Sequence, residues 1–383
     1  MQRVYFDNAA TTPVSEEVIQ AMIPVLRELY GNPSSIHAEG RAVRALLESA
    51  RKTVAHAIGA STADVFFTSG GTESNNMAIK GAVRDLGVQR IISSSTEHHC
   101  VLHTLETVEK EKGIAIVWLP VDTLGRVDLD ALEQYLADGQ GLKTLVSLMH
   151  ANNEIGTMLD LDRVSALCRQ HGALLHTDSV QTVGHFPIDV NKTPVHFLSG
   201  AAHKFHGPKG VGFIYINPSS TIKPLLDGGA QERNMRGGTE NVYGIAGLAK
   251  ALELAIAHME DRSRYIRELR SYMIDQLQAA FPGVRFNGDY TGNSLYTVLS
   301  VSFPPSAKNE LLLLSLDIAG ISASGGSACS SGAEKGSHVL AAIGADPDRK
   351  SIRFSFSHYN TPAEVDCVIG KLREILPAPA AIL

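Results

Sequence analysis

Between residues 64 and 216 the chain alternates short β-rich runs with segments of helical periodicity. Residues 64–71 predict a strand that ends in a glycine turn, and residues 72–86 predict the helix that follows. The same pattern predicts further strands at residues 90–99, 114–122, 144–156, 173–181 and 211–216. Such alternation is typical of a mostly parallel sheet with helices on both faces. The chain is therefore predicted to have an α/β fold.

The pattern changes after about residue 245. A long helical stretch runs to residue 281, and strand-like and helical segments alternate after it. This change predicts a large domain over residues 15–249 and a smaller α+β domain over residues 250–383. Residues 1–14 are expected to pack on the smaller domain.

Unusual polar clusters follow four of the predicted strands, at residues 69–72, 97–99, 152–154 and 178–181. In parallel sheets the polar residues at the carboxyl ends of the strands line the ligand crevice. Four clusters at such ends therefore predict one binding crevice.

Composition narrows the class of protein. The hydrophobic share is 44% and the charged share 19%, as in a soluble globular protein. The net charge of −6 does not favour nucleic acid or an anionic membrane as partner, and no apolar run is long enough to span a bilayer. The four cysteines are widely scattered, which predicts free thiols in a reducing cytoplasm: Cys100, Cys168, Cys329 and Cys367.

Three candidates in the crevice each have an ordinary alternative. The glycines before Thr72 open a helix start that attracts an anion such as phosphate, although an ordinary strand-to-helix turn looks the same. Asp178 could hold a protonated ring nitrogen or cap a helix. His98 could stack on a heterocycle, move a proton, or simply pack at a strand end. His99 and His103 have the spacing of a metal pair, but no third ligand group is evident, so no metal is expected.

Lys204 connects these candidates. It lies between two histidines in a turn of small residues, just before the strand at residues 211–216. A partly buried crevice favours the neutral amine, which is the reactive form of a lysine. An anion site, an aspartate for a pyridinium, an aromatic ring and this amine together match what pyridoxal 5'-phosphate requires.

The chain resembles the class V aminotransferase family of fold type I, and within it the cysteine desulfurases of the NifS/IscS type. The resemblance depends on ordered motifs from end to end: YFDNAATTP, YGNPSSIHAEGR, FTSGGTESNN, EHHCVL, NNEIGT, HTDSVQ, AHKFHGPKGVG, GGAQERNMRGGTENV, SGGSACSSG, SHVL and SIRFSFS. It implies a mostly parallel seven-stranded sheet in the large domain.

The resemblance also implies roles for single residues. Lys204 would carry the cofactor covalently, Asp178 would pair with its ring nitrogen, and Gln181 would hydrogen-bond its ring hydroxyl. His98 would stack on the ring. Four residues would hold the phosphate, the last of them from the partner subunit of a homodimer: Gly71, Thr72, His203 and Thr239.

For the substrate, the resemblance implies that Asn153 and Arg353 hold the carboxylate of L-cysteine. Cys329 lies among glycine, serine and alanine in residues 322–336, which predicts a mobile loop with an exposed thiol. This thiol would take the sulfur as a persulfide, leaving L-alanine, and pass it to an acceptor protein in iron–sulfur cluster assembly or thiolation.

Two departures from the family pattern bear on these expectations. Ala201 stands where many members have a phosphate-binding serine, and the chain ends without the longer tail through which housekeeping members engage their scaffold. Three rival functions stay open: a plain aminotransferase or lyase, a selenocysteine lyase, and a non-catalytic sulfur carrier or scaffold. The aminotransferase would have no use for Cys329.

Overall fold

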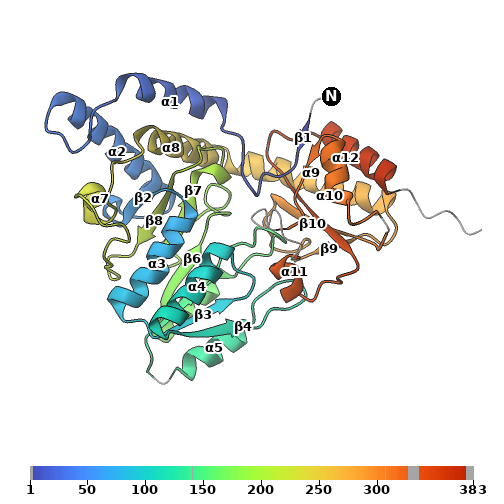
Figure 1. The fold of residues 1–383 in the computed structure, drawn as a ribbon, viewed down its shortest axis with the longest axis horizontal. Coiled ribbons are helices and arrows are strands. Elements are labelled where there is room, and N and C mark those ends of the chain that lie inside the picture. Colours follow the sequence, from blue (N-terminus) through green and yellow to red (C-terminus); the bar gives the residue numbers. More distant parts are fainter. Residues whose placement is uncertain (1–2, 140, 307, 327–335, 377–383) are drawn as a thin grey trace, which may run out of the picture.

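The structure, a computed structural model, describes residues 3–139, 141–306, 308–326 and 336–376 (Figure 1). Its centre is a seven-stranded sheet. In spatial order the strands are β2 (Val65–Thr68), β8 (Gly212–Ile216), β7 (Phe197–Ala201), β6 (Leu174–Asp178), β5 (Thr144–Ser147), β3 (Arg90–Ser94) and β4 (Ala115–Leu119). β8 runs antiparallel to the other six strands, which share one direction, so the predicted mostly parallel sheet is confirmed.

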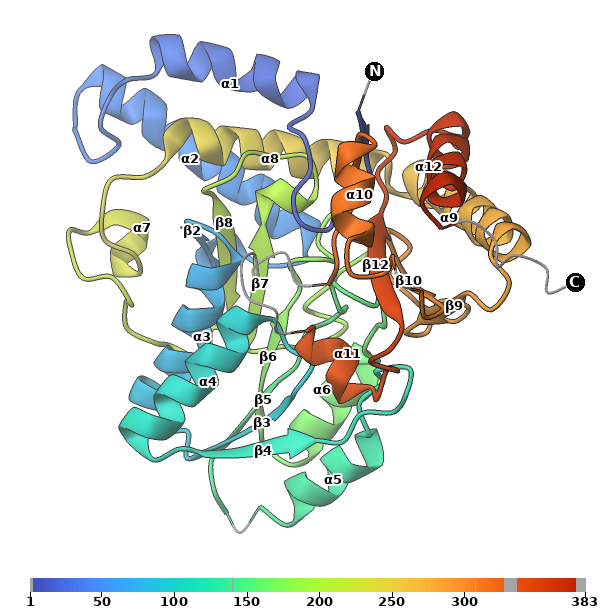
Figure 2. The same cartoon turned by 45° about the vertical axis from the view of Figure 1, so that its right-hand side comes forward.

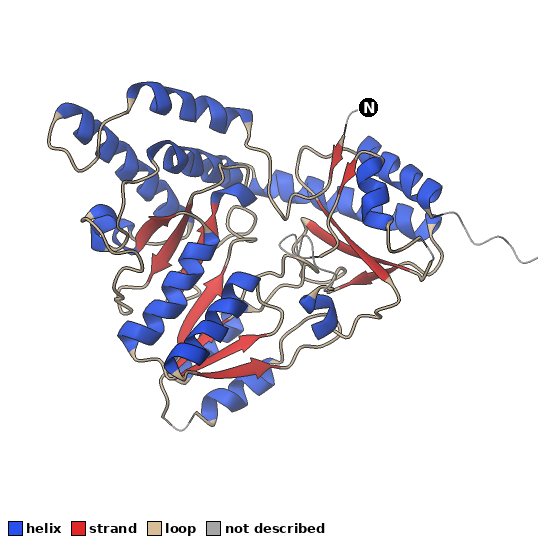
Figure 3. Cartoon of the chain, in the orientation of Figure 1, coloured by secondary structure: helices blue, strands red, loops and turns tan. Residues whose placement is uncertain are grey.

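Helices cover both faces of this sheet (Figure 3). The helices of this part of the chain are α1 (Glu16–Glu28), α2 (Ala38–Ala57), α3 (Gly71–Leu86), α4 (His99–Lys112), α5 (Leu129–Ala137), α6 (Leu161–Gln170), α7 (Gln231–Asn234) and α8 (Val242–Ala257), with short 3-10 helices η1 (Thr62–Asp64) and η2 (Ala202–Lys204). Among them α1 packs on α8 rather than on the sheet. Successive strand residues point to opposite faces. Ile91 packs with α3 and α4 in one buried cluster, whereas Ile92 packs with α2, α5, α6 and α8 in another.

A second hydrophobic core lies beside the sheet. It is built on the antiparallel strands β9 (Arg285–Asn287), β10 (Val298–Phe303) and β12 (Lys350–Ser355), covered by α9 (Met259–Ala280), α10 (Leu312–Ile318) and α12 (Pro362–Ile375). The short helix α11 (His338–Ala342) contributes to a small separate cluster. The N-terminal strand β1 (Val4–Tyr5) pairs with β11 (Ile321–Ser322), and Figure 2 shows β1 beside α10 and α12.

The domain boundary expected at residue 249 stays a prediction. Helix α8 continues to Ala257, and its buried residues Ala251, Leu252 and Ala255 belong to the core of the central sheet. Within the described ranges no single helix is both long and apolar enough to cross a membrane, although the bent pair of α8 and α9 reaches that length and composition together.

Candidate active site

A cavity of about 250 Å³ lies at the carboxyl ends of the central strands, between them and β12. It is lined by most of the residues that the sequence selects, drawn from positions far apart in the chain. The predicted residues on its wall are Gly71, Thr72, His98, Asn153, Asp178, Gln181, His203, Lys204 and Arg353. The fold therefore gathers nine predicted residues at one crevice, while their individual roles stay predictions.

Lys204 ends η2, directly after β7. Its Nζ donates hydrogen bonds to the carbonyl oxygens of Ala9 and Ala10, at 2.6 and 2.9 Å. The neighbouring ring of His203 hydrogen-bonds Thr11 Oγ1 at 3.2 Å, and burial, with the charges of Lys204 and Lys209, lowers the pKa of His203 to about 4. The lysine thus reaches across the crevice to the N-terminal segment, beside a neutral histidine.

Asp178 is the last residue of β6, and a chain of buried polar side chains holds it. Its Oδ2 accepts from Asn75 Nδ2 at 2.6 Å and its Oδ1 from the N–H of Val180 at 3.0 Å. The Asn75 amide oxygen lies 3.1 Å from Nε2 of His176. Burial lowers the pKa of His176 to about 4, so the ring is neutral and donates from Nε2 to Asn75. Asn75 therefore fixes the carboxylate, a function that the sequence analysis missed.

His98 is the N-cap of α4. The N–H of Cys100 donates to its Nδ1 at 3.2 Å, which leaves the proton of the neutral ring on Nε2. Burial lowers the pKa of His98, against the opposing charge of Asp178. The same ring nitrogen lies 3.0 Å from Cys100 Sγ, and Cys100 itself lines the cavity. Burial raises the pKa of Cys100 to about 12, so this thiol stays protonated.

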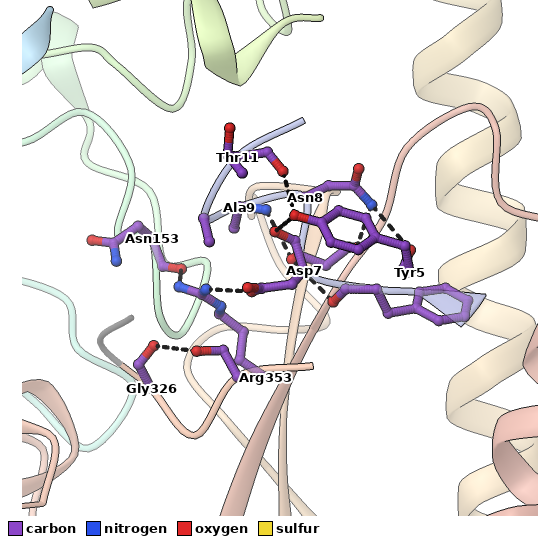
Figure 4. Close-up of polar contacts among 12 residues, drawn as sticks. Tyr5, Asp7, Asn8, Ala9, Thr11, Asn153, Gly326 and Arg353 are labelled. Carbon is purple, nitrogen blue, oxygen red and sulfur yellow. Dashed lines mark hydrogen bonds and ion pairs between the residues drawn. The ribbon is translucent and has the colours of Figure 1, made fainter. Parts of the chain in front are cut away.

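Arg353 lies on β12 with 2% of its surface exposed, yet its side chain lines the cavity. NH1 donates to the carbonyl of Asn153 at 2.9 Å and NH2 to Asp7 Oδ1 at 2.8 Å (Figure 4). Nε is buried without a hydrogen-bond acceptor among the described residues. Figure 4 shows the Asn153 amide on the far side of that residue from the guanidinium. Asp7 was also missed from sequence, since no local pattern joins it to β12.

The start of α3 offers backbone N–H groups to the cavity. Its N-cap is Gly70, which makes no side-chain capping bond, and Gly71 and Thr72 line the cavity. A Cβ on Gly71 would meet Val180 Cγ2 at 2.6 Å, so the backbone here approaches the segment that follows β6 more closely than a side chain would allow. A free helix N-terminus is an anion site, here on the same wall as Lys204 and Asp178. These residues fit a phosphorylated pyridine aldehyde, whereas Ala201 contributes no hydroxyl.

The structure places one predicted residue away from this wall and does not describe another. Thr239 lines a separate hollow with Ser69 and Arg236. Cys329 lies outside the described residues. Of the described residues on either side of it, Ser324 pairs with the backbone of Arg353, which lines the cavity. His338 Nε2 hydrogen-bonds the carbonyl of Glu97, the residue before His98, at 2.9 Å.

The possible metal pair, His99 and His103, has ring centroids 5.3 Å apart. No group of three or more His, Cys, Asp or Glu side chains within the described part of the chain is arranged to hold a metal ion.

Comparison with known proteins gives consistent results. The family model of class V aminotransferases matches residues 4–368. The chain is 45% identical to the cysteine desulfurase IscS of Dictyoglomus turgidum, over 98% of this chain and 95% of that protein. It is also 45% identical to the cysteine desulfurase IscS of Methanosarcina thermophila, over 97% and 92%. A solved NifS-like protein superposes with a TM-score of 0.90 at 38% identity, over 98% of this chain and 99% of that one.

These matches confirm the resemblance to NifS/IscS-type cysteine desulfurases and the α/β fold expected with it. The chain belongs to the class V aminotransferase family.

Proposed function

We propose that this chain is a pyridoxal phosphate-dependent cysteine desulfurase that converts L-cysteine to L-alanine and collects the sulfur on Cys329. The observation that carries the proposal is the convergence of Lys204, Asp178 and Arg353 on one cavity. Full-length relatives that are cysteine desulfurases support it. When bound, pyridoxal phosphate supplies an electron sink for the bond-breaking steps at the substrate.

The crevice would hold that cofactor by groups already fixed. The N-terminus of α3 would take the phosphate, with His203 beside it. Asp178, held by Asn75, would face the ring nitrogen, and Gln181 would face the ring hydroxyl. His98 would lie against the ring, with its proton on Nε2. Lys204 would supply the amine for covalent attachment.

The substrate would be bound on the side of the cavity formed by β12. Arg353 is buried and charged, and a planar guanidinium suits a carboxylate. Asn153 lines the cavity beside it. With the carboxylate held there, the amine of Lys204 removes the Cα proton, and His98 Nε2 offers a second proton-transfer group.

In the sulfur step the Cys329 thiolate attacks the substrate sulfur. An S–S bond forms and the C–S bond breaks, its electron pair going to the carbon side, which gains protons and leaves as alanine. The chain flanking Cys329 supports this role, because Ser324 pairs with Arg353 and Ser337 Oγ donates to Glu154 Oε2 at 2.5 Å. Cys100 lines the cavity too, but its raised pKa of about 12 makes it a poor nucleophile.

The proposal extends to partners. Thr239 lines a hollow other than the Lys204 cavity, consistent with a phosphate contact made in the partner subunit of a homodimer. The persulfide would pass to an acceptor protein in iron–sulfur cluster assembly or thiolation. The scattered cysteines favour a cytoplasmic location.

The test is an assay of L-cysteine for alanine and sulfide with wild type, Cys329→Ala and the matched control Cys367→Ala, an exposed cysteine on α12. We expect Cys329→Ala to lose sulfide release while keeping the visible absorbance of bound cofactor, and Cys367→Ala to match wild type. Full sulfide release by Cys329→Ala would favour a lyase, and a purified protein that binds no cofactor would favour a carrier. Faster turnover of selenocysteine than of cysteine would favour a selenocysteine lyase.

A further inference from the structure

Arg353 is paired in the structure with the carboxylate of Asp7, which has no role in the proposed reaction. NH2 donates to Asp7 Oδ1 at 2.8 Å, and the two residues are 346 positions apart. The Asp7 side chain is 21% exposed and that of Arg353 is 2% exposed, so the pair is largely shielded from solvent. A contact of this kind is stronger than an exposed ion pair.

Hydrogen bonds hold the turn that carries Asp7 in place. Its carbonyl accepts from the N–H of Ala10 at 3.0 Å and from Tyr5 Oη at 3.2 Å. The same hydroxyl donates to Thr11 O at 2.8 Å, and burial raises the pKa of Tyr5 to about 12, so it stays a donor. On the other side, the N–H of Ala9 donates to Ser355 Oγ at 2.8 Å. Asp7 is thus fixed to the strand that carries Arg353 (Figure 4).

Two fixed acceptors on different nitrogens determine the plane of a guanidinium. The carbonyl of Asn153 binds NH1, and Asp7 binds NH2. Neither acceptor uses Nε, which has no acceptor within the described residues. An arginine side chain otherwise has many rotamers, and holding one of them in advance lowers the cost of binding.

We propose that Asp7 is a positioning residue, which orients Arg353 so that its remaining N–H groups meet the α-carboxylate of the amino-acid substrate. The inference rests on the proposed function of Arg353 as the carboxylate contact. Asp7 acts as a hydrogen-bond acceptor in a fixed place, and its negative charge is secondary to that place. The residue touches Arg353 rather than the reacting atoms, so its effect appears in binding of the carboxylate.

The experiment compares Asp7→Ala and Asp7→Asn, each with L-cysteine and with L-cysteine methyl ester, which has no free carboxylate. The matched control is Asp317→Ala, because Asp317 also pairs with an arginine, Arg3, but 62% of its side chain is exposed. We expect Asp7→Ala to raise KM for L-cysteine about tenfold, with kcat within about threefold. For the ester, Asp7→Ala should change KM by less than about twofold, since the ester has no carboxylate for the oriented guanidinium of Arg353 to bind.

Asp7→Asn keeps an oxygen acceptor, so we expect it to restore KM for L-cysteine to within about threefold of wild type. If Asp7→Ala does not accumulate as folded protein, Asp7→Ser takes its place, because a serine hydroxyl is too short to reach NH2. An equal rise in KM for acid and ester, no rise at all, or an Asp7→Asn variant as impaired as Asp7→Ala would each overturn the inference.

Calorimetric binding of L-alanine, the product, separates this inference from the proposed function. It needs no sulfur transfer, so a wild type that binds L-alanine but releases no sulfide contradicts only the proposed reaction. Weakened binding of L-alanine in Asp7→Ala, by about tenfold, supports the inference even then. If Asp7→Ala binds L-alanine as tightly as wild type does, while the wild type releases sulfide as proposed, the inference about Asp7 is wrong and the proposed function stands.

Discussion

The two walls of the crevice are built differently. On the sheet side, Asp178 ends β6, Lys204 follows β7, and His98 caps the helix after β3. Each is placed by a strand end or helix start within a few residues of itself. On the N-terminal side, Arg353 and Asp7 come from opposite ends of the chain and meet only because β12 packs beside the first residues.

The difference indicates a division of work. Groups suited to covalent and proton chemistry lie on the sheet side, and a hydrogen-bond chain through Asn75 and His176 holds one of them, Asp178. The N-terminal side offers a positioned guanidinium at Arg353. Changes on the sheet side should therefore act mainly on kcat, and changes on the N-terminal side mainly on KM.

The largest expected effect is on the sheet side. Lys204→Ala removes both the proposed attachment point of the cofactor and the proposed base, so kcat for L-cysteine should fall by about 10⁴-fold or more. Steady-state sulfide release measures it, with Lys209→Ala, a nearby lysine outside the cavity lining, as control. A loss of less than about tenfold would break the comparison, because another group would then do the chemistry.

The free energy of unfolding should depend on pH because of His176, the buried histidine on the sheet side. The folded pKa of His176 is about 4, below the ordinary 6.5, so the unfolded chain binds a proton that the folded one does not. Its contribution is fully present above pH 6.5 and is lost as pH falls from 6.5 to 4. The loss is on the order of 3 kcal/mol at pH 4.

Urea unfolding at pH 7 and pH 4.5 measures that loss. The variant His176→Gln cannot titrate, so the difference in unfolding free energy between the two pH values should be smaller in it than in wild type. Identical pH dependence in the two proteins would show that His176 has the same pKa in the folded and unfolded states, and would contradict the lowered pKa.

Asn75→Ala sharpens the comparison further. It leaves Asp178 Oδ2 without its 2.6 Å partner, so kcat should fall about 30-fold with little change in KM. The matched control is Asn76→Ala, because the hydrogen bond that the Asn76 amide makes within the described residues goes to the carbonyl of Thr72 in its own helix. An effect of Asn76→Ala as large as that of Asn75→Ala would assign the loss to α3 rather than to Asp178.

The smallest effect is expected on the N-terminal side. Arg353→Lys keeps the charge but loses the planar guanidinium that binds Asp7 and Asn153 and that we propose binds the substrate carboxylate, so KM for L-cysteine should rise about tenfold. The value of kcat should change less than about threefold. A fall in kcat with constant KM would reverse the division between the two walls.

The same contrast explains what could be predicted from sequence. The parallel sheet was predictable because most of its strands are short buried runs between helical segments, and Asp178 was found because it lies at the end of such a run. Lys204 was found because it lies between two histidines just before the run at residues 211–216, whereas the strand that precedes it, β7, was not predicted. After residue 245 the sequence pattern predicted a long helical stretch, but it did not show where α8 ends within that stretch. The helix continues through its buried residues to Ala257.

Asn75 and Asp7 could not be found in this way. Asn75 is one of two adjacent asparagines on α3, and only the packing of α3 on β6 distinguishes it from Asn76. Asp7 looks like a turn residue, and its pairing with Arg353 depends on tertiary contacts across 346 positions. Local pattern carries no information on contacts of that range.

The most direct test is to find where the sulfur goes. The wild type is incubated with L-cysteine in the absence of a sulfur acceptor and of added reductant. The masses of its cysteine-containing peptides are then measured by mass spectrometry. We expect one added sulfur atom on Cys329 and none on Cys100, although Cys100 lines the cavity. Sulfur found on Cys100, and absent from Cys329, would contradict the account, because the buried thiol would then be the nucleophile despite its raised pKa.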